Sequence, residues 1–184
     1  TLISEAQQAI VEIAAEKIRP GFIPLGSLTG PMLETIRQLV DRKEAVTGVP
    51  SGFVDLDNLT AGFHPSEFIV VAARPSMGKT ALALNMTQYI GLQTDYHTGF
   101  FSIEMSKEQV AMRLLCAEAQ VDLKKARSGF ISEREFERLR LAGETLSQAR
   151  IYIDESAALT VMEMKAKCRR LKLEGHLDIV FVDY

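Results

Sequence analysis

The sequence contains few of the residues that mark disulfide-bonded or metal-binding proteins. Its 184 residues include two cysteines and three histidines. Cys116 and Cys168 form no C-x-x-C pair and fall in predicted helices, so we expect reduced thiols in the core of an intracellular protein. His64, His97 and His176 lack the spacing of metal ligands, which argues against a zinc site.

Long apolar runs and a signal sequence are also missing. No run approaches the roughly 18 apolar residues that a membrane-spanning helix needs, and the first residues show no signal-peptide pattern. We therefore expect a cytoplasmic protein without membrane contact. The chain begins with Thr1 and not with Met, so we expect that a segment precedes it.

Neither sign of charge dominates the composition. The chain has 21 basic and 24 acidic residues, for a net charge of −3, and 47% of its residues are hydrophobic. This balance does not indicate a nucleic-acid partner, although local patches can act within an acidic chain. The length and apolar content suit one globular domain with an appended segment.

The appended segment is predicted to be a helical arm over residues 1–45. Ser4 and Gln7 form a capping-box pattern ahead of an apolar stripe that Pro20 and Gly21 terminate. Residues 21–31 are rich in glycine and proline and predict a linker, and a second amphipathic helix is expected from Pro31. Two such helices bury little surface alone, so the arm packs either on its own domain or on a neighbouring subunit.

Residues 46–184 are predicted to form an α/β domain. Apolar runs at residues 68–73 and in "TGFFSIE", "RIYIDE" and "LDIVFVDY" read as strands. Helix starts are marked by three cap pairs: Ser106 with Gln109, Ser132 with Glu135, and Thr160 with Glu163. The predicted order is strand, helix, strand, two helices, strand, helix, strand, which is typical of a parallel sheet with helices on both faces.

The stretch "FIVVAARPSMGKT" places Gly-Lys-Thr directly after a predicted buried strand. At such a strand-to-helix turn, the free N–H groups and partial positive charge of the helix start bind an anion. Gly78 lets the backbone approach phosphate, the Lys79 ammonium reaches the β and γ phosphates, and the Thr80 hydroxyl can ligate Mg²⁺. The predicted nucleotide-binding residues are Arg74, Pro75, Ser76, Met77, Gly78, Lys79, Thr80 and Ala81.

One position departs from the phosphate-loop pattern G-x-x-x-x-G-K-[ST]. Ala73 stands where the pattern has its first glycine. Alanine would be unfavourable there if the backbone needed a positive φ. We expect instead that Ala73 keeps a strand-like backbone and that Pro75 stiffens the following turn.

Two acidic residues follow other predicted strands, and their carboxyl ends should meet at the same edge of the sheet. Asp183 is predicted to support Mg²⁺ through water, with a strand-end cap as the alternative. Glu104 is predicted to be the general base that activates water, with a helix-start acid as the alternative. Asp154 and Glu155 are interpreted as loop acids ahead of the Thr160 helix, and the basic residues at 167–172 as a solvated helix face.

Taken together, "TGVPSGFVDLDNLTAGF", "ARPSMGKTALALN", "FFSIEMS" and "IVFVDY" resemble the RecA-like motor domain of the DnaB family of replicative DNA helicases. The resemblance covers nearly the whole chain and includes Ala73 as an ordinary variant. It implies a RecA-like P-loop NTPase fold, ATP and Mg²⁺ as ligands, and a homohexamer moving on single-stranded DNA at the bacterial or phage replisome. It also implies contact of the arm with the adjacent subunit, and primase and a helicase loader as partners. It supports Lys79 and Thr80 in nucleotide binding, Glu104 as the base and Asp183 as the metal-supporting acid.

The sequence stops at Tyr184, just after the Walker B strand that ends in Asp183. The family pattern continues with further strands, DNA-binding loops and an arginine finger, so we expect residues 1–184 alone to be inactive as a helicase. A RecA-like recombinase or repair ATPase would share the loop and Glu104. A non-catalytic module that recruits primase or a loader is the third possibility.

Overall fold

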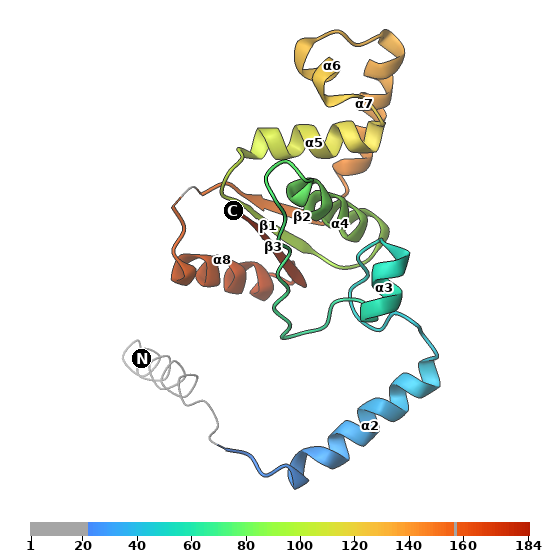
Figure 1. Cartoon of the computed structure of the whole chain (residues 1–184), viewed down its shortest axis with the longest axis vertical. Coiled ribbons are helices and arrows are strands. Elements are labelled where there is room, and N and C mark those ends of the chain that lie inside the picture. The colour runs from blue at the N-terminus through green and yellow to red at the C-terminus, as the bar shows by residue number, and fades with distance from the viewer. Residues whose placement is uncertain (1–21, 157) are drawn as a thin grey trace, which may run out of the picture. The chain divides into compact units, whose positions relative to one another are not determined.

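The computed structural model describes residues 22–156 and 158–184 (Figure 1). The chain divides into two compact units, residues 1–44 and 45–184. The helix predicted from Ser4 to the Pro20–Gly21 break lies outside the described residues.

The first unit contains helix α2, Gly26–Arg42, which begins five residues before the predicted start at Pro31. Most of the predicted linker is therefore helical. The first turn is held by the backbone and side chain of Ser27, which both donate to the Pro24 carbonyl at 3.0 and 2.7 Å. Pro31 lies inside the helix, where it removes one hydrogen bond without ending it. The large apolar side chains from Leu25 to Val40 are all at least 39% exposed.

The second unit is built on a parallel sheet of three strands in the order β2-β1-β3. The strands are β1, Thr98–Ser102, β2, Ile151–Asp154, and β3, Ile179–Asp183. These three strands and their parallel pairing are as predicted. Every residue of the central strand β1 is buried, as expected for a parallel strand covered on both faces.

The fourth predicted strand, at residues 68–73, does not form, and this prediction was wrong. The segment takes no part in the sheet, and Phe68 and Val70 are 91% and 65% exposed. An apolar run becomes a strand only when a neighbouring strand accepts hydrogen bonds from its N–H groups and donates to its C=O groups. Within the described residues the sheet has the order β2-β1-β3, and residues 68–73 pair with none of these strands.

The helices alternate with the strands. Between β1 and β2 the structure has three helices where two were predicted: α5, Lys107–Ala119, α6, Leu123–Ser128, and α7, Glu133–Leu146. The short α6 is set by the Asp122 cap and by Gly129 at φ 76°. The remaining helices are α3, Val54–Thr60, α4, Lys79–Gln93, and α8, Val161–Leu173.

Three of the predicted helix starts are confirmed. Ser132 with Glu135 and Thr160 with Glu163 form complete capping boxes, and the Ser106 hydroxyl accepts from the Gln109 N–H. Because each cap fixes where a helix begins, it also fixes the length of the loop that follows the preceding strand.

The core lies where α4 and α5 cover the sheet. Leu84 of α4, Phe100 of β1, and Val110 and Leu114 of α5 form one buried cluster. A second cluster of Ala119, Val121 and Ala142 joins α5 to α7. Helix α8 lies apart from α4 and α5 (Figure 1), and a cavity of about 320 Å³ is lined by α8 residues and by β1 and β2. None of the described helices is both long and apolar enough to cross a membrane.

Candidate nucleotide-binding site

The phosphate-loop sequence occupies the turn that leads into α4. The Met77 N–H donates to the Arg74 carbonyl at 3.2 Å, and Ser76 and Gly78 have φ of 64° and 93°. Ala73 is not among the residues with positive φ, so the missing glycine causes no backbone strain. A Cβ at Gly78 would meet no atom within 4 Å, which means that glycine is favoured there by its φ and not by lack of space.

Helix α4 begins at Lys79, immediately after this turn. Gly78 is its N-cap, and the Leu82 N–H donates to the Gly78 carbonyl at 2.8 Å. The N–H groups of the first turn have no partner further back in the helix and face the preceding loop. Together with the helix dipole, they favour an anion at this position.

Asp183 joins the end of β3 to the start of α4. Its Oδ2 accepts a 2.7 Å hydrogen bond from the Thr80 hydroxyl, and the Lys79 Nζ lies 3.3 Å from its Oδ1. The Asp183 side chain is 3% exposed, whereas that of Lys79 is 31% exposed. Lys79 also donates to the Tyr184 carbonyl and lies over the Tyr184 ring, 5.1 Å from its centre. Lys79, Thr80 and Asp183, predicted separately from sequence, are therefore in direct contact.

Glu104 lies at the same edge of the sheet. Ser102, the last residue of β1, is the register partner of Asp183, and the Ile103 N–H donates to the Asp183 carbonyl at 3.0 Å. Glu104 follows in an exposed bend. Glu104 is exposed to solvent. In the described part of the chain, its carboxylate forms no hydrogen bond or ion pair with Lys79, Thr80 or Asp183.

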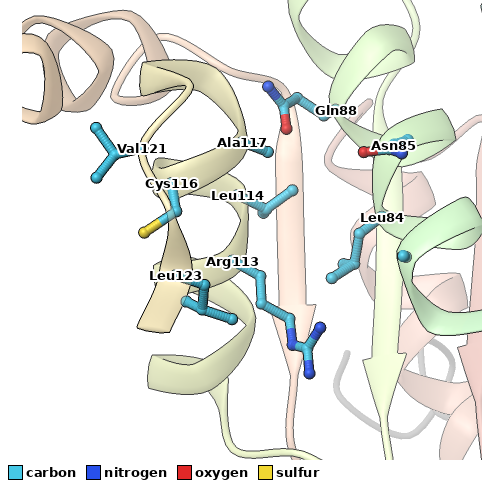
Figure 2. A pocket seen from close by; sticks show the side chains of 10 residues that line it. Leu84, Asn85, Gln88, Arg113, Leu114, Cys116, Ala117, Val121 and Leu123 are labelled. Carbon is cyan, nitrogen blue, oxygen red and sulfur yellow. The ribbon is translucent and has the colours of Figure 1, made fainter. Parts of the chain in front are cut away.

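A groove of about 240 Å³ lies between α4 and α5 (Figure 2). Ala81 lines it, together with Leu84 and Leu114, and residues 74–80 do not. Arg113 projects along this groove, and its buried Nε has no hydrogen-bond partner within the described ranges. Ala81 therefore borders both the phosphate loop and a separate groove.

The oxygen atoms at the loop suit a magnesium ion. Mg²⁺ in phosphate-binding sites takes one or two protein oxygens, with phosphate and water as the other ligands. The Thr80 hydroxyl and Asp183 carboxylate supply such oxygens 2.7 Å apart. Residues 22–156 and 158–184 contain no cluster of three His, Cys, Asp or Glu side chains able to enclose a metal ion, so a site made wholly of protein side chains does not fit.

One contact at this edge was missed. Glu155, interpreted as a loop acid, accepts from both the backbone and the side chain of Lys107 at the start of α5. The two residues are 48 positions apart, and no sequence spacing signals such a pair. The only indication available was that both follow strand ends, which a parallel sheet brings to one edge.

A phosphate-loop sequence at the start of α4, on a parallel sheet flanked by helices, is the architecture of the RecA-like P-loop NTPases. The family model for the DnaB-like helicase C-terminal domain matches residues 48–184. The chain belongs to this family.

The relatives extend the similarity to the whole chain. It is 43% identical over 183 residues to the replicative DNA helicase DnaC of Bacillus subtilis (strain 168) and 39% identical to the replicative DNA helicase DnaB of Geobacillus stearothermophilus. All of this chain is covered in both cases, but only 40% of each relative. The chain thus spans about two fifths of the length of these relatives.

Two solved structures share the fold. One is an ATPase domain with a TM-score of 0.78 at 32% identity, and the match covers 86% of this chain and 57% of that one. The other is a DnaB-like replicative helicase, described with its interactions with primase. It has a TM-score of 0.74 at 31% identity, and the match covers 100% of this chain and 44% of the helicase. The α/β fold class and the predicted family are confirmed.

Proposed function

We propose that this chain is part of the motor of a replicative DNA helicase, which hydrolyses ATP to move along single-stranded DNA and unwind duplex at the fork. The observation that carries the proposal is the contact of Thr80 and Lys79 with the buried Asp183 carboxylate. This contact puts the loop, the helix start and a strand-end acid in one place. Membership of the DnaB-like family supports the choice of a helicase over a recombinase or repair ATPase.

Nucleotide binding is assigned to the loop and to the start of α4. The N–H groups of residues 76 and 78–80 and the Lys79 ammonium bind phosphate oxygens, and Arg74, Pro75, Met77 and Ala81 form the surrounding surface. Thr80 would hold a magnesium ion through its hydroxyl, and Asp183 would support that ion through water. The ion would supply positive charge to the phosphate oxygens. Because Lys79 and Thr80 already contact one carboxylate, their side chains are held on the side of the loop that faces β3.

Glu104 is assigned as the general base. It accepts a proton from the water that attacks the γ-phosphate, a role that requires an ionised and accessible carboxylate. Its exposed position, two residues past the register partner of Asp183, provides that access.

Assembly and partners follow from the family and from the arm. The apolar side chains of α2 are exposed along the length of the helix, as expected for a helix that packs on another surface. We assign this surface to contact with a neighbouring subunit of a homohexamer. Single-stranded DNA, primase and a helicase loader are the further partners, in the cytoplasm at a bacterial or phage replisome.

The test is Glu104→Gln in the complete gene product, which keeps the side-chain shape but cannot accept a proton. Nucleotide affinity should stay nearly unchanged, while DNA-stimulated phosphate release falls by about 10²-fold or more. Unwinding of a forked duplex should fall in parallel. Glu108→Gln is the matched control, because Glu108 is an exposed acid in the first turn of α5 and its side chain is 70% exposed.

Two results would overturn the proposal. Hydrolysis by Glu104→Gln at the wild-type rate would reduce Glu104 to a helix-start acid. ATP hydrolysis and strand exchange without unwinding, in the unmodified protein, would favour a recombinase.

A further inference from the structure

The loop that holds Glu104 is connected to the loop after β2 by one side chain. The Glu155 Oε2 accepts from the Lys107 N–H at 2.9 Å, and its Oε1 accepts from the Lys107 Nζ at 2.6 Å. Lys107 is the first residue of α5, and Glu155 directly follows the last residue of β2. The contact therefore joins two strand-to-helix connections.

The bend that contains Glu104 spans residues 103–105, and hydrogen bonds fix the chain on both sides of it. On the β3 side, the Ile103 N–H donates to the Asp183 carbonyl at 3.0 Å. Inside the bend, the Ser102 hydroxyl donates to the Met105 carbonyl at 2.7 Å, and Met105 packs on the buried cluster. On the β2 side, the chain is fixed by the hydrogen bond that the Lys107 N–H donates to Glu155. Lys107 lies three residues after Glu104.

The backbone bond matters more than the ion pair. The Lys107 side chain is 59% exposed, and exposed ion pairs contribute little because both side chains lose entropy and water screens the charges. The Lys107 N–H, in contrast, is one of the donors that a helix start leaves without an internal partner. A carboxylate there satisfies a donor and interacts favourably with the helix dipole.

The hydrogen bonds from the Lys107 side chain and backbone also lower the pKa of Glu155. The acid is therefore ionised at neutral pH and accepts with both oxygens. Neighbouring Asp154 is occupied elsewhere, since it accepts from the Lys167 Nζ of α8 at 2.5 Å. Of these two adjacent acids, Glu155 bonds to the start of α5 and Asp154 bonds to α8.

We propose that Glu155 is a positioning residue for hydrolysis, which fixes the start of α5 and thereby the place of the Glu104 carboxylate relative to the phosphate loop. This proposal rests on the assignment of Glu104 as the base. It predicts that removal of the Glu155 carboxylate lowers the rate of the chemical step and leaves nucleotide binding intact, because within the described ranges Glu155 has its hydrogen bonds and ion pair with Lys107 and none with residues 74–80.

The experiment measures ATP hydrolysis and fluorescent-nucleotide affinity in the complete gene product. Glu155→Ala should lower kcat by roughly tenfold to 10²-fold, the usual cost of misplacing a reacting group by about 1 Å. KM and the nucleotide Kd should stay within about twofold. Asp154→Asn is the matched control. The kcat of this variant should remain near wild type, because Asp154 accepts its hydrogen bond from Lys167 of α8 and not from α5.

Two further variants separate the effect of side-chain length at position 155 from the effect of its charge. Glu155→Gln keeps the length and one acceptor oxygen, so it should retain most of the rate. Glu155→Asp keeps the charge but is one methylene shorter, so it should lose the backbone bond and much of the rate. The opposite order would overturn the proposal, because charge and not position would then decide. These two conservative changes also keep the test informative if Glu155→Ala does not fold.

The decisive measurement combines Glu155→Ala with Glu104→Gln. If Glu155 acts through Glu104, the double variant should be no slower than Glu104→Gln alone. Fully additive losses would overturn the positioning role, as would an unchanged kcat in Glu155→Ala. If Glu104→Gln itself hydrolyses at the wild-type rate, the proposed base fails, and that result is distinct from a failure of Glu155 alone.

Discussion

Strand β3 and residues 68–73 are both short apolar runs that lead directly to polar residues of the candidate site, yet only β3 forms a strand. Phe181 packs against the buried cluster, and β3 pairs along its length with β1. Phe68 is 91% exposed and its segment pairs with no strand within the described ranges. The comparison shows that an apolar run sets the tendency to form a strand, whereas a partner strand decides the outcome.

The same difference determines how the site is held. Asp183 is fixed because β3 is paired, and it fixes Thr80 in turn. The phosphate loop is anchored at its α4 end and through Asp183, while the chain before it is exposed. The geometry of the site is therefore set by α4 and β3 and not by the segment that precedes the loop.

The largest effect should come from removing a buried ring of the paired sheet. Phe100→Ala should lower the free energy of unfolding by about 3–5 kcal/mol, because Phe100 is 1% exposed at the centre of the core. Phe68→Ala should change it by less than about 0.5 kcal/mol. Urea unfolding of the two variants measures both values. Similar decreases would show that residues 68–73 are packed.

A smaller but specific effect is expected at the loop. Lys79→Ala should weaken nucleotide binding by about 1.5–3 kcal/mol for each hydrogen bond to phosphate that it removes. Fluorescent-nucleotide titration measures the change in affinity. Lys172→Ala is the control, since this exposed lysine of α8 pairs with Asp178 at 3.3 Å. Equal affinities for wild type and Lys79→Ala would rule out the assigned role.

The link between the loop and β3 can be cut separately. Thr80→Val keeps the shape but removes the hydroxyl that donates to the buried Asp183, at an expected cost of about 1–2 kcal/mol in unfolding free energy. Thr145→Val is the control, because its hydroxyl bonds to the Leu141 carbonyl on an exposed helix face. If both variants lower the free energy of unfolding equally, the Thr80–Asp183 hydrogen bond contributes no more to stability than an exposed one.

The smallest effect concerns pH and the start of α7. The backbone N–H and hydroxyl of Ser132 donate to Glu135 and lower its pKa from 4.5 to about 2. A lowered folded-state pKa stabilises the fold above pH 4.5, and this contribution disappears as the pH falls towards 2. The difference in melting temperature between wild type and Glu135→Gln should therefore shrink as the pH falls from 4.5 towards 2. A constant difference between the two would contradict the capping role.

Local signals in the sequence predicted much of the structure. The caps at Ser132 and Thr160 fix helix starts through bonds three residues away, so they are visible as short patterns. Thr80 and Asp183 were predictable as partners because a parallel sheet brings strand ends and the following helix starts to one edge. The three confirmed strands were predicted because each lies in a short apolar run.

The remaining features depend on distant contacts. Whether residues 68–73 pair depends on a neighbouring strand, which no local pattern describes. Helix α6 is only six residues long and too short to show a period. The bond between Glu155 and Lys107 joins residues 48 positions apart, and its existence follows from the register of β1 with β2. Sequence patterns describe what a segment favours, whereas these features depend on what lies next to it.

The register between β1 and β3 has a consequence for which changes this domain can accommodate. Ser102 lies opposite Asp183, and the bend with Glu104 begins at the next residue. Side chains alternate between the two faces of a strand, so one inserted or deleted residue within Ile179–Asp183 would turn the Asp183 carboxylate to the opposite face. Outward residues such as Val180 and Val182 can be exchanged without moving it. Variation in this strand should therefore consist of substitutions at constant length.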